Sequence, residues 1–286
     1  MVVLVTGANG QLGQAIQSIA GNYSSIDFVF CTSTHLDITS LENCTTIFEQ
    51  YRPNYCINAA AYTAVDKAEK EPEKAQLINV NGAKNLAEVC KKNNTILLHV
   101  STDFVFDGTS KKPYTELDIP NPTGVYGQTK LEGEIAIQNT WEQHFIIRTS
   151  WVYSAFGNNF MKTMLRLANE RKELSVVNDQ IGTPTNAVDL AEFLVKIICH
   201  SQLVAESNFG VYNFSNEGQC SWYDFAKEIF NQKGIIMDLK GIPTSAYPTL
   251  AKRPEYSVLD KTKSAITFEI SIKNWEQSLK ECALLL

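Results

Sequence analysis

The stretch VVLVTGANGQLG, residues 2–13, decides how the rest of the chain is interpreted. Val2 to Thr6 form a short run rich in β-branched residues, which is typical of a buried strand. Three glycines follow at a G-x-x-G-x-x-G spacing, and the pattern from about Gln11 to Ala20 predicts a helix. We therefore expect a strand, a tight glycine loop and a helix, in that order.

A glycine loop in this position can hold a pyrophosphate. Its backbone N–H groups can approach phosphate oxygens, and the helix N-terminus adds the positive end of its dipole. The last glycine allows the helix to pack closely on the strand. The pattern therefore predicts a dinucleotide site at Gly7, Gly10, Gln11, Leu12 and Gly13, with a merely structural turn as the alternative.

Strands and helices alternate through the first half of the chain. Further strands are expected at 26–31, 55–58, 96–100 and 145–149, and helices at 41–51, 72–92 and 125–140. This order predicts an α/β fold with a Rossmann-type doubly wound parallel sheet and helices on both faces.

Beyond Trp151 the alternation weakens, which predicts a smaller mixed C-terminal lobe that binds the substrate. Helices are expected there at 159–171, 186–200, 222–232 and 272–284. The expected division is residues 1–150 for the nucleotide-binding domain and 151–286 for the lobe, with residues near 175–200 packing back on the sheet.

Composition excludes several classes of protein. The 286 residues are 44% hydrophobic and 20% charged, as in an ordinary globular protein. A net charge of -6 argues against nucleic-acid binding, because phosphate neutralisation needs basic surface. The seven cysteines show no short pairing, so neither a zinc site nor a disulfide framework is predicted. No apolar run suits a signal peptide or a membrane-spanning helix, and the cytoplasm is the expected location.

The end of the second strand bears on the choice of cofactor. An acidic residue usually binds the adenosine ribose there, but this chain has Phe30-Cys31-Thr32-Ser33. The hydroxyls leave room for a 2′-phosphate and favour NADPH over NADH; the alternative is that these loop residues contact no ligand. Asp37 is a candidate for the adenine amino group, with Ile38 against the ring. Farther on, Ala61, Tyr62 and Thr63 follow the third strand, where small side chains would let a flat cofactor lie close to the backbone.

Tyr126 and Lys130 are the candidate proton-delivering pair. Residues four apart share one helix face, and a phenol with an ordinary pKa of ~10 needs a nearby cation to act as an acid near neutrality. The alternative is a half-buried tyrosine with a solvated lysine. The strand that ends at Val100-Ser101-Thr102-Asp103 supports the functional interpretation, because ligands of open α/β sheets bind outside the carboxyl ends of the strands. Thr102 would then reach the crevice that holds Tyr126.

Segments spread over nearly the whole chain resemble the extended short-chain dehydrogenases, and within them the dTDP-4-dehydrorhamnose reductases. The segments are TGANGQLG (6–13), NAAAYTAVDKAE (58–69), STDFVFDG (101–108), VYGQTKLEGE (125–134), RTSWVY (148–153), GNNFMKTMLRLA (157–168), VVNDQIGTPT (176–185) and SAYPTLAKRP (245–254). The last three lie outside the general superfamily pattern and narrow the resemblance to these reductases.

The resemblance implies the reduction of dTDP-4-dehydrorhamnose by hydride transfer from NADPH or NADH. It implies that Tyr126 donates a proton to the nascent alkoxide, that Lys130 supports it and that Thr102 tunes it. Thr102 and Asp103 would touch the sugar, and Trp151 would form part of the sugar pocket, with a core tryptophan as the alternative. Arg253, beside Pro254, is a candidate for the diphosphate because a guanidinium suits phosphate oxygens.

One residue departs from the family pattern. Members commonly have tyrosine after the Thr-Asp pair, but this chain has Phe104, so the hydrogen bond of that hydroxyl is missing. Some members also hold magnesium at a dimer interface through glutamates; those ligands cannot be mapped here, and no metal is predicted. The oligomeric state stays open, with a homodimer as one expectation.

Three alternatives share much of this pattern. A sugar-nucleotide dehydratase would need a glutamate where Phe104 stands. A 4-epimerase would share Tyr126 and Lys130 but retain its cofactor through turnover. The regulatory subunit of methionine adenosyltransferase resembles the same family and acts as a binding partner, so the two residues do not exclude it.

Overall fold

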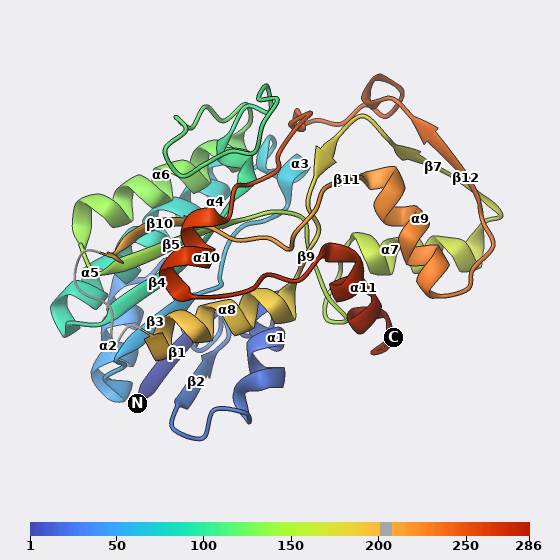
Figure 1. The fold of residues 1–286 in the computed structure, drawn as a ribbon. Coiled ribbons are helices and arrows are strands. Elements are labelled where there is room, and N and C mark those ends of the chain that lie inside the picture. Colours follow the sequence, from blue (N-terminus) through green and yellow to red (C-terminus); the bar gives the residue numbers. More distant parts are fainter. Residues whose placement is uncertain (201–207) are drawn as a thin grey trace.

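The computed structural model describes residues 1–200 and 208–286 and has a six-stranded sheet at its centre (Figure 1). In spatial order the strands are β10 (Gly210–Asn213), β5 (His144–Thr149), β4 (Ile96–Thr102), β3 (Tyr55–Asn58), β1 (Val2–Thr6) and β2 (Asp27–Cys31). Every neighbouring pair is parallel. The predicted Rossmann-type doubly wound sheet is confirmed.

Helices cover both faces of the sheet, as Figure 1 shows. One face carries α1 (Gln11–Ala20) and α8 (Ala187–His200), and the other carries α2 (Leu41–Tyr51), α5 (Gly82–Asn93) and α6 (Val125–Thr140).

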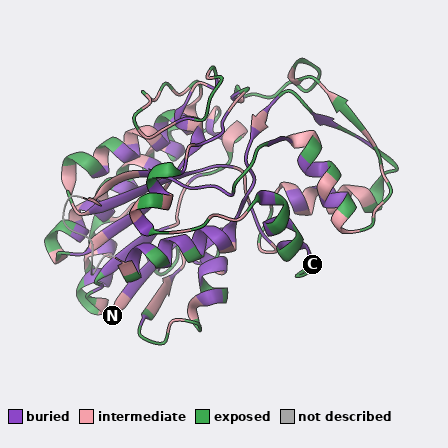
Figure 2. Ribbon diagram, viewed as in Figure 1, coloured by how far each residue is buried: buried purple, intermediate pink, exposed green. Residues whose placement is uncertain are grey.

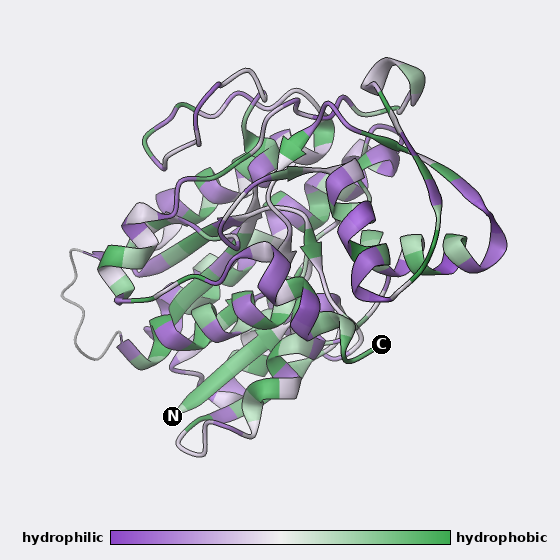
Figure 3. Cartoon of the chain, turned by 45° about the vertical axis from the view of Figure 1, so that its right-hand side comes forward, coloured by the Kyte–Doolittle hydropathy of each residue, from purple (hydrophilic) through white to green (hydrophobic). Residues whose placement is uncertain are grey.

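Strand residues alternate between two separate cores because successive side chains point to opposite faces. Val3 and Val5 pack in the core shared with α1 and α8, whereas Leu4 packs with α2 and α5. Figure 2 shows the buried residues concentrated on the sheet and on the inner sides of the helices, and Figure 3 shows the hydrophobic strands beneath more mixed helices.

The order in which strands are added to the sheet reverses next to β1. It runs from β1 to β2 at one edge and then crosses to β3 on the other side of β1. Such a switch point opens a crevice outside the carboxyl ends of the two strands, and this is where doubly wound sheets bind their ligands. The glycine loop leaves β1 at this point, and Asn58 ends β3 beside it.

The helix predicted over 72–92 is interrupted. It consists of α4 (Pro72–Gln76), a π-helical segment η1 (Leu77–Asn81) and α5. The buried Asn79 side chain within η1 accepts a hydrogen bond from Tyr62 N and donates to Tyr62 O and to the Thr129 hydroxyl. The π turn thus places the Asn79 amide so that it binds the loop after β3 and helix α6. Such turns are frequent at functional sites. A short helix, α3 (Val65–Ala68), was not predicted.

The second lobe is built on three two-stranded sheets rather than on one large sheet. The pairs are β6 (Val152–Tyr153) with β9 (Thr185–Asn186), β7 (Glu173–Val177) with β12 (Asp238–Ile242), and β8 (Ile181–Gly182) with β11 (Cys220–Ser221). The helices α7 (Phe160–Glu170), α9 (Trp222–Gln232) and α11 (Trp275–Ala283) share one hydrophobic core with residues of β6, β7, β11 and β12.

Parts of the second half of the chain return to the large sheet. β10 pairs with β5, and α8 packs on α1. Phe268, at the end of α10 (Thr262–Phe268), lies in the same core as Val3 and Phe145. Neither β10 nor α10 was predicted. Among the described residues, no helix is both long and apolar enough to cross a membrane.

Candidate active site

The glycine loop brings two backbone segments into contact at the switch point. Gly7 has φ +65°, and a Cβ there would lie 2.8 Å from the Ala59 carbonyl. A Cβ on Gly13 would lie 2.4 Å from the Gly7 oxygen. Only glycine fits at both positions, because one needs a left-handed backbone and the other has no space for a side chain.

The start of α1 is suited to a phosphate. Its N-cap, Gly10, provides no side-chain hydrogen bond to the helix, and its first turn holds no acidic residue. The first N–H groups of a helix have no partner within it and carry the positive end of the dipole. The loop and the helix start therefore fit the pyrophosphate of a dinucleotide.

Gln11 links the two lobes through its side chain. Its Oε1 accepts hydrogen bonds from the Ser154 hydroxyl at 3.1 Å and from Asn159 Nδ2 at 2.9 Å. Asn159 is the N-cap of α7 in the second lobe. The Gln11 side chain is thus engaged within the protein. The predicted contacts of Gln11 and Leu12 with a cofactor would be made by their backbone N–H groups.

The region predicted to bind adenosine contains exposed hydroxyls and one packed side chain. Thr32 and Thr34 share a hydrogen bond of 2.9 Å between their hydroxyls at the surface. The exposed Asp37 accepts hydrogen bonds from the backbone and hydroxyl of Thr39. Ile38 is 5% exposed and packs against α5 in the core, so little of it is left to cover an adenine ring. Contacts of Asp37 and Ile38 with adenine stay a prediction.

The loop after β3 is fixed at Tyr62. Its hydroxyl donates to Glu71 at 3.0 Å, and its backbone is held by Asn79 from the π turn. Ala61 is partly exposed and Thr63 is exposed. The small residues thus border the crevice, while the tyrosine ring packs toward α4.

Tyr126 lies in the first turn of α6, close to the end of β4. A Cβ on the neighbouring Gly127 would lie 2.1 Å from the Phe104 carbonyl, so glycine allows the helix to approach the residues after β4. The rings of Tyr126 and Phe104 meet edge to face, with centroids 5.5 Å apart. The Thr102 hydroxyl donates to Asp103 Oδ1 at 3.0 Å. The structure thus brings Tyr126, Thr102 and Asp103 together, as predicted from the strand end.

The protonation states of this group follow from burial. Burial raises the pKa of Tyr126 to about 12; Asp103 acts in the same direction, and the Thr102 hydroxyl opposes it. Burial also raises the pKa of Asp103 to about 6, although hydrogen bonds lower it. Asp103 Oδ2 is buried and accepts no hydrogen bond within the described ranges. The site therefore offers a protonated phenol and an unused carboxylate oxygen.

Lys130 points into the protein rather than toward the phenol. Its Nζ donates to the Val100 carbonyl at 2.7 Å and lies 3.1 Å from His99 Nε2. Burial lowers the pKa of Lys130 to about 8, against the opposing charge of Glu134. No hydrogen bond joins Lys130 to Tyr126 in the part of the chain that the structure describes.

A cavity of about 790 Å³ adjoins Phe104 on the side of the second lobe. Trp151 and Trp222 line it and stack face to face, with centroids 3.5 Å apart and planes at 10°. Trp151 has φ +46°, and its indole leaves no space for a Cβ on Gly182. Trp151 is thus an aromatic wall of the cavity, although its backbone conformation is an uncommon one for tryptophan.

Two arginines reach the same cavity. Arg253 forms a bidentate ion pair with Asp66, with bonds of 2.9 and 2.6 Å, and it lowers the pKa of that carboxyl. Arg171 also lines the cavity, and the described residues give it no ion pair. The positive charge of Arg253 is therefore already balanced, and its contact with a diphosphate stays a prediction.

Comparison with known proteins identifies the family. The model of the RmlD substrate binding domain matches residues 1–285. The chain belongs to this family. The dTDP-4-dehydrorhamnose reductase of Aggregatibacter actinomycetemcomitans is 43% identical over 285 residues, which cover 97% of each chain. The resemblance inferred from the sequence segments is confirmed.

Solved structures of the RmlD family have the same fold. The dTDP-4-dehydrorhamnose reductase from Clostridium acetobutylicum gives a TM-score of 0.94 at 43% identity, covering 100% of this chain and 99% of that one. The enzyme from Bacillus anthracis, solved in complex with NADP, gives 0.95 at 38% identity with the same coverage.

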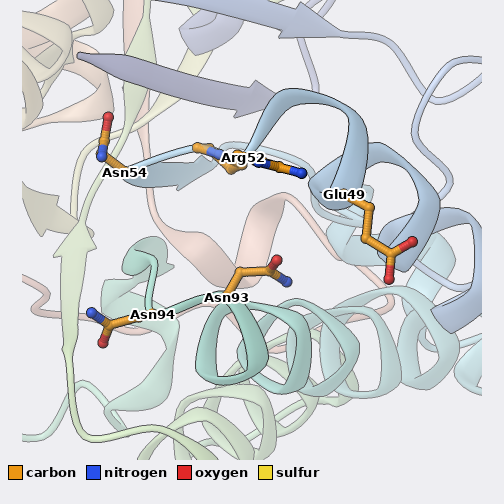
Figure 4. Close-up of a pocket in the computed structure, with 6 residues that line it drawn as sticks. Glu49, Arg52, Asn54, Asn93 and Asn94 are labelled. Carbon is orange, nitrogen blue, oxygen red and sulfur yellow. The ribbon is translucent and has the colours of Figure 1, made fainter.

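A second cavity lies at the amino ends of the strands of the large sheet, opposite to the carboxyl ends where Tyr126 lies. It measures about 500 Å³ and is lined by Glu49, Arg52, Asn54, Asn93 and Asn94, besides Pro53 (Figure 4). These residues come from the ends of α2 and α5 and from the segment that enters β3. Because it adjoins the amino end of β3, this cavity is away from the switch point and from Tyr126.

Several residues that the structure places near the candidate site were not predicted from the sequence. His99 and Asn58 stand in apolar strands, and polar residues there were the available signal. Glu134 and Arg148 form a buried ion pair of 2.7 Å, and the Ser101 hydroxyl donates a hydrogen bond to Glu134. Trp222 begins α9 and had no sequence signal, because its partner Trp151 is distant along the chain.

Proposed function

We propose that this chain reduces dTDP-4-dehydro-L-rhamnose to dTDP-L-rhamnose with NADPH or NADH, the last step in making dTDP-rhamnose. The observation that carries the proposal is the position of Tyr126. Its protonated phenol stands beside Thr102 and Asp103, and the Phe104 ring that it contacts lines the same cavity as Trp151. Membership of the RmlD family and the names of its relatives support the same substrate.

The nicotinamide cofactor supplies the hydride for C4 of the sugar. Gly7, Gly10 and Gly13 would hold its pyrophosphate, because their loop offers backbone N–H groups without side chains in the way. The hydroxyls of Thr32 and Thr34, with no acid at the end of β2, favour NADPH. The B. anthracis relative in complex with NADP agrees with this preference.

Tyr126 acts as the general acid. Its pKa of about 12 keeps the phenol protonated at neutral pH, so it can donate its proton to the oxygen on C4 as negative charge develops there. The phenolate left behind needs a cation, and Lys130, one turn farther along α6, is the residue that can provide it. Thr102 lowers the pKa of the phenol and favours proton release.

The sugar would be held from two sides. The buried Asp103 carboxylate, which the Ser257 and Thr102 hydroxyls already approach, would accept a hydrogen bond from a sugar hydroxyl. The indole of Trp151 offers a broad apolar face to the deoxysugar. Phe104, where the family resemblance implies tyrosine, contributes ring contact but no hydroxyl. Arg253 and Arg171 are the candidates for the diphosphate.

Location, assembly and the competing enzyme classes follow from the same residues. We infer a cytoplasmic location from the sequence, with a homodimer as the expected assembly. The dehydratase alternative is disfavoured because Phe104 cannot perform elimination chemistry. An epimerase differs in that it would not consume its cofactor in turnover.

The test is direct. Purified protein is incubated with NADPH or NADH and dTDP-4-dehydrorhamnose, and the absorbance of the reduced nicotinamide is followed. Stoichiometric oxidation is expected, faster with NADPH. No oxidation with either cofactor would overturn the proposal and favour a non-catalytic binding partner.

A further inference from the structure

The helix that carries Tyr126 is held by close contacts along its later turns. The Thr129 hydroxyl of α6 accepts a hydrogen bond from Asn79 Nδ2 at 3.1 Å. A Cβ on Gly133 would lie 2.3 Å from the Asn79 carbonyl, so α6 packs directly on the π turn there. The Glu134 carboxylate is bound by the buried arginine of β5. These contacts lie on the C-terminal side of Tyr126, and its own turn, the first of the helix, needs other partners.

The first turn of α6 has no cap of its own. Its N-cap is Gly124, which has no side chain, and none of the residues of this turn is acidic. The backbone N–H groups at the start of a helix have no acceptor within it and carry the positive end of the dipole. The turn that contains Tyr126 therefore depends on an acceptor from another segment.

Glu69 supplies that acceptor from the end of α3. Val125 N, adjacent to Tyr126, donates to Glu69 Oε1 at 2.9 Å. A Cβ on Gly124 would lie 2.8 Å from the same oxygen, so a glycine at the N-cap leaves space for the carboxylate. Its negative charge also interacts favourably with the positive end of the α6 dipole. The glutamate thus joins two segments that are more than fifty residues apart in the sequence.

The contact between α3 and α6 also has an apolar part. Ala68 is fully buried in a small cluster, and Val125 and Tyr126 pack against this cluster. Because Ala68 directly precedes Glu69, two consecutive residues bring a buried methyl group and a carboxylate to the first turn of α6. The position of α3 therefore bears directly on the position of Tyr126.

The same short helix holds one wall of the cavity that Trp151 lines. Asp66 of α3 forms its bidentate ion pair with Arg253 and also accepts a hydrogen bond from Ala251 N at 3.1 Å. Arg253 and the adjacent Pro254 line the cavity. Residues 251–254 are thus attached to α3 by side-chain and backbone bonds, and α3 lies between this wall and the first turn of α6.

We propose that Glu69 is a positioning residue whose carboxylate ties the first turn of α6 to α3 and so sets the Tyr126 phenol relative to the cavity wall. The inference rests on the proposed function, in which Tyr126 gives its proton to a sugar bound in that cavity. Proton transfer requires hydrogen-bond distance between the two oxygens, and a small misplacement lowers the rate steeply. A cap that belonged to α6 itself would stabilise the helix without fixing this distance.

Substitution of Glu69 should lower the rate of the chemical step and leave binding intact. In Glu69→Ala we expect the single-turnover rate of NADPH oxidation with dTDP-4-dehydrorhamnose to fall about tenfold, because the phenol is no longer held in register. KM for the sugar nucleotide and NADPH affinity by fluorescence titration should match the parent. Glu69→Gln keeps an oxygen acceptor for Val125 N, so its rate should stay within about threefold of the parent. A folded Glu69→Ala protein with the parent's rate would overturn the proposal.

A second variant separates the link to α3 from helix capping. Apart from its chain neighbours, a Cβ on Gly124 meets only the Glu69 carboxyl group within 4 Å among the described residues, and the φ of −147° suits any residue. In Glu69→Ala/Gly124→Ser the serine can therefore cap α6. We expect the midpoint of thermal unfolding to recover while the single-turnover rate stays low, because serine makes no link to α3. Recovery of the parent's rate would show that Glu69 is merely a cap and would contradict the proposal.

The matched control removes a cap far from Tyr126. Asn274 is the N-cap of α11 in the second lobe and accepts a hydrogen bond from Glu276 N at 2.9 Å. Asn274→Ala should lower the midpoint of thermal unfolding as Glu69→Ala does, and its single-turnover rate should equal that of the parent. An equal loss of rate in both variants would attribute the effect of Glu69 to stability alone.

Amide hydrogen exchange tests the link without substrate or cofactor. In Glu69→Ala the Val125 amide should exchange about fivefold faster, as expected for the loss of one net hydrogen bond. The Trp141 amide, which donates to the Ile137 carbonyl at the other end of α6, should be unchanged. Unchanged exchange at Val125 would overturn the proposal even in an active reductase. Faster exchange supports the link whether or not the parent oxidises NADPH, and absence of oxidation by the parent would overturn the proposed function alone.

Discussion

The two sides of the candidate site are built in different ways. On the cofactor side, backbone meets backbone: Gly7 packs on Ala59, and Gly13 packs on the Gly7 carbonyl. On the substrate side, side chains make the wall, with Trp151 stacked on Trp222 across two elements of the second lobe. The first construction tolerates no added atom, whereas the second can be altered by changing how two rings pack.

Tyr126 lies between the two sides, and its loss should have the largest effect. Tyr126→Phe removes the proton donor and keeps the ring against Phe104. We expect turnover to fall by ~10²–10⁴, the usual contribution of a general acid. NADPH affinity, measured by fluorescence titration, should be nearly unchanged. Full turnover in this variant would remove Tyr126 from the mechanism.

On the cofactor side, a single methyl group should be costly. In Gly13→Ala the new Cβ would stand 2.4 Å from the Gly7 oxygen, so the loop must shift. We expect a loss of about 1–3 kcal/mol in the free energy of unfolding, together with weaker NADPH binding. Gly21→Ala is the control at the other end of α1, because nothing lies within 4 Å of its Cβ. Equal effects of the two substitutions on NADPH binding would contradict the backbone-built cradle.

Ionised Asp103 should help to bind the sugar but lower the free energy of unfolding. Its folded-state pKa of about 6 lies above the ordinary value of 3.8, so the free energy of unfolding falls as pH rises from about 4 to about 6. Asp103→Asn should therefore be more stable than the parent at pH 7.5, by up to about 3 kcal/mol, with the difference vanishing near pH 4. Denaturant titrations at the two pH values measure this, and turnover should fall because the amide offers a weaker acceptor to the sugar.

On the substrate side, loss of the stacked partner should be milder. Trp222→Leu frees one face of Trp151, and we expect KM for the sugar nucleotide to rise about fivefold, in line with about 1 kcal/mol for an aromatic pair. NADPH affinity should stay constant. Trp222→Phe retains part of the stack, so its KM should lie between those of the parent and of Trp222→Leu. A change in NADPH affinity instead would argue that the cofactor side and the substrate side are not separate.

The smallest effect is expected at Phe104. Phe104→Tyr introduces the residue that the family resemblance implies at this position while preserving the edge-to-face contact with Tyr126. Added to a site that already has Asp103 and Thr102, one exposed hydroxyl should change KM by about threefold at most. A loss of activity would show that the cavity has adapted to the smaller ring.

The difference between the two sides also explains what could be predicted from the sequence. Glycine spacing and strand periodicity determine how backbones approach, so the glycine loop, the first five strands of the large sheet and the position of Tyr126 followed from local patterns. The Trp151–Trp222 stack and the His99–Lys130 contact join residues that are distant in sequence and share no pattern. The four-residue strand β10 and the π turn at Asn79 depend on tertiary hydrogen bonds, which propensity does not report.

The return of α8, β10 and Phe268 to the large sheet has a consequence for synthesis on the ribosome. The first 150 residues emerge with the face of the sheet that α1 shares with α8 only partly covered and with the outer edge of β5 unpaired. Exposed apolar faces and open strand edges are where nascent chains associate wrongly. Because Phe268 completes this core, the large sheet reaches its final packing only after residue 268 has been translated and released from the ribosome.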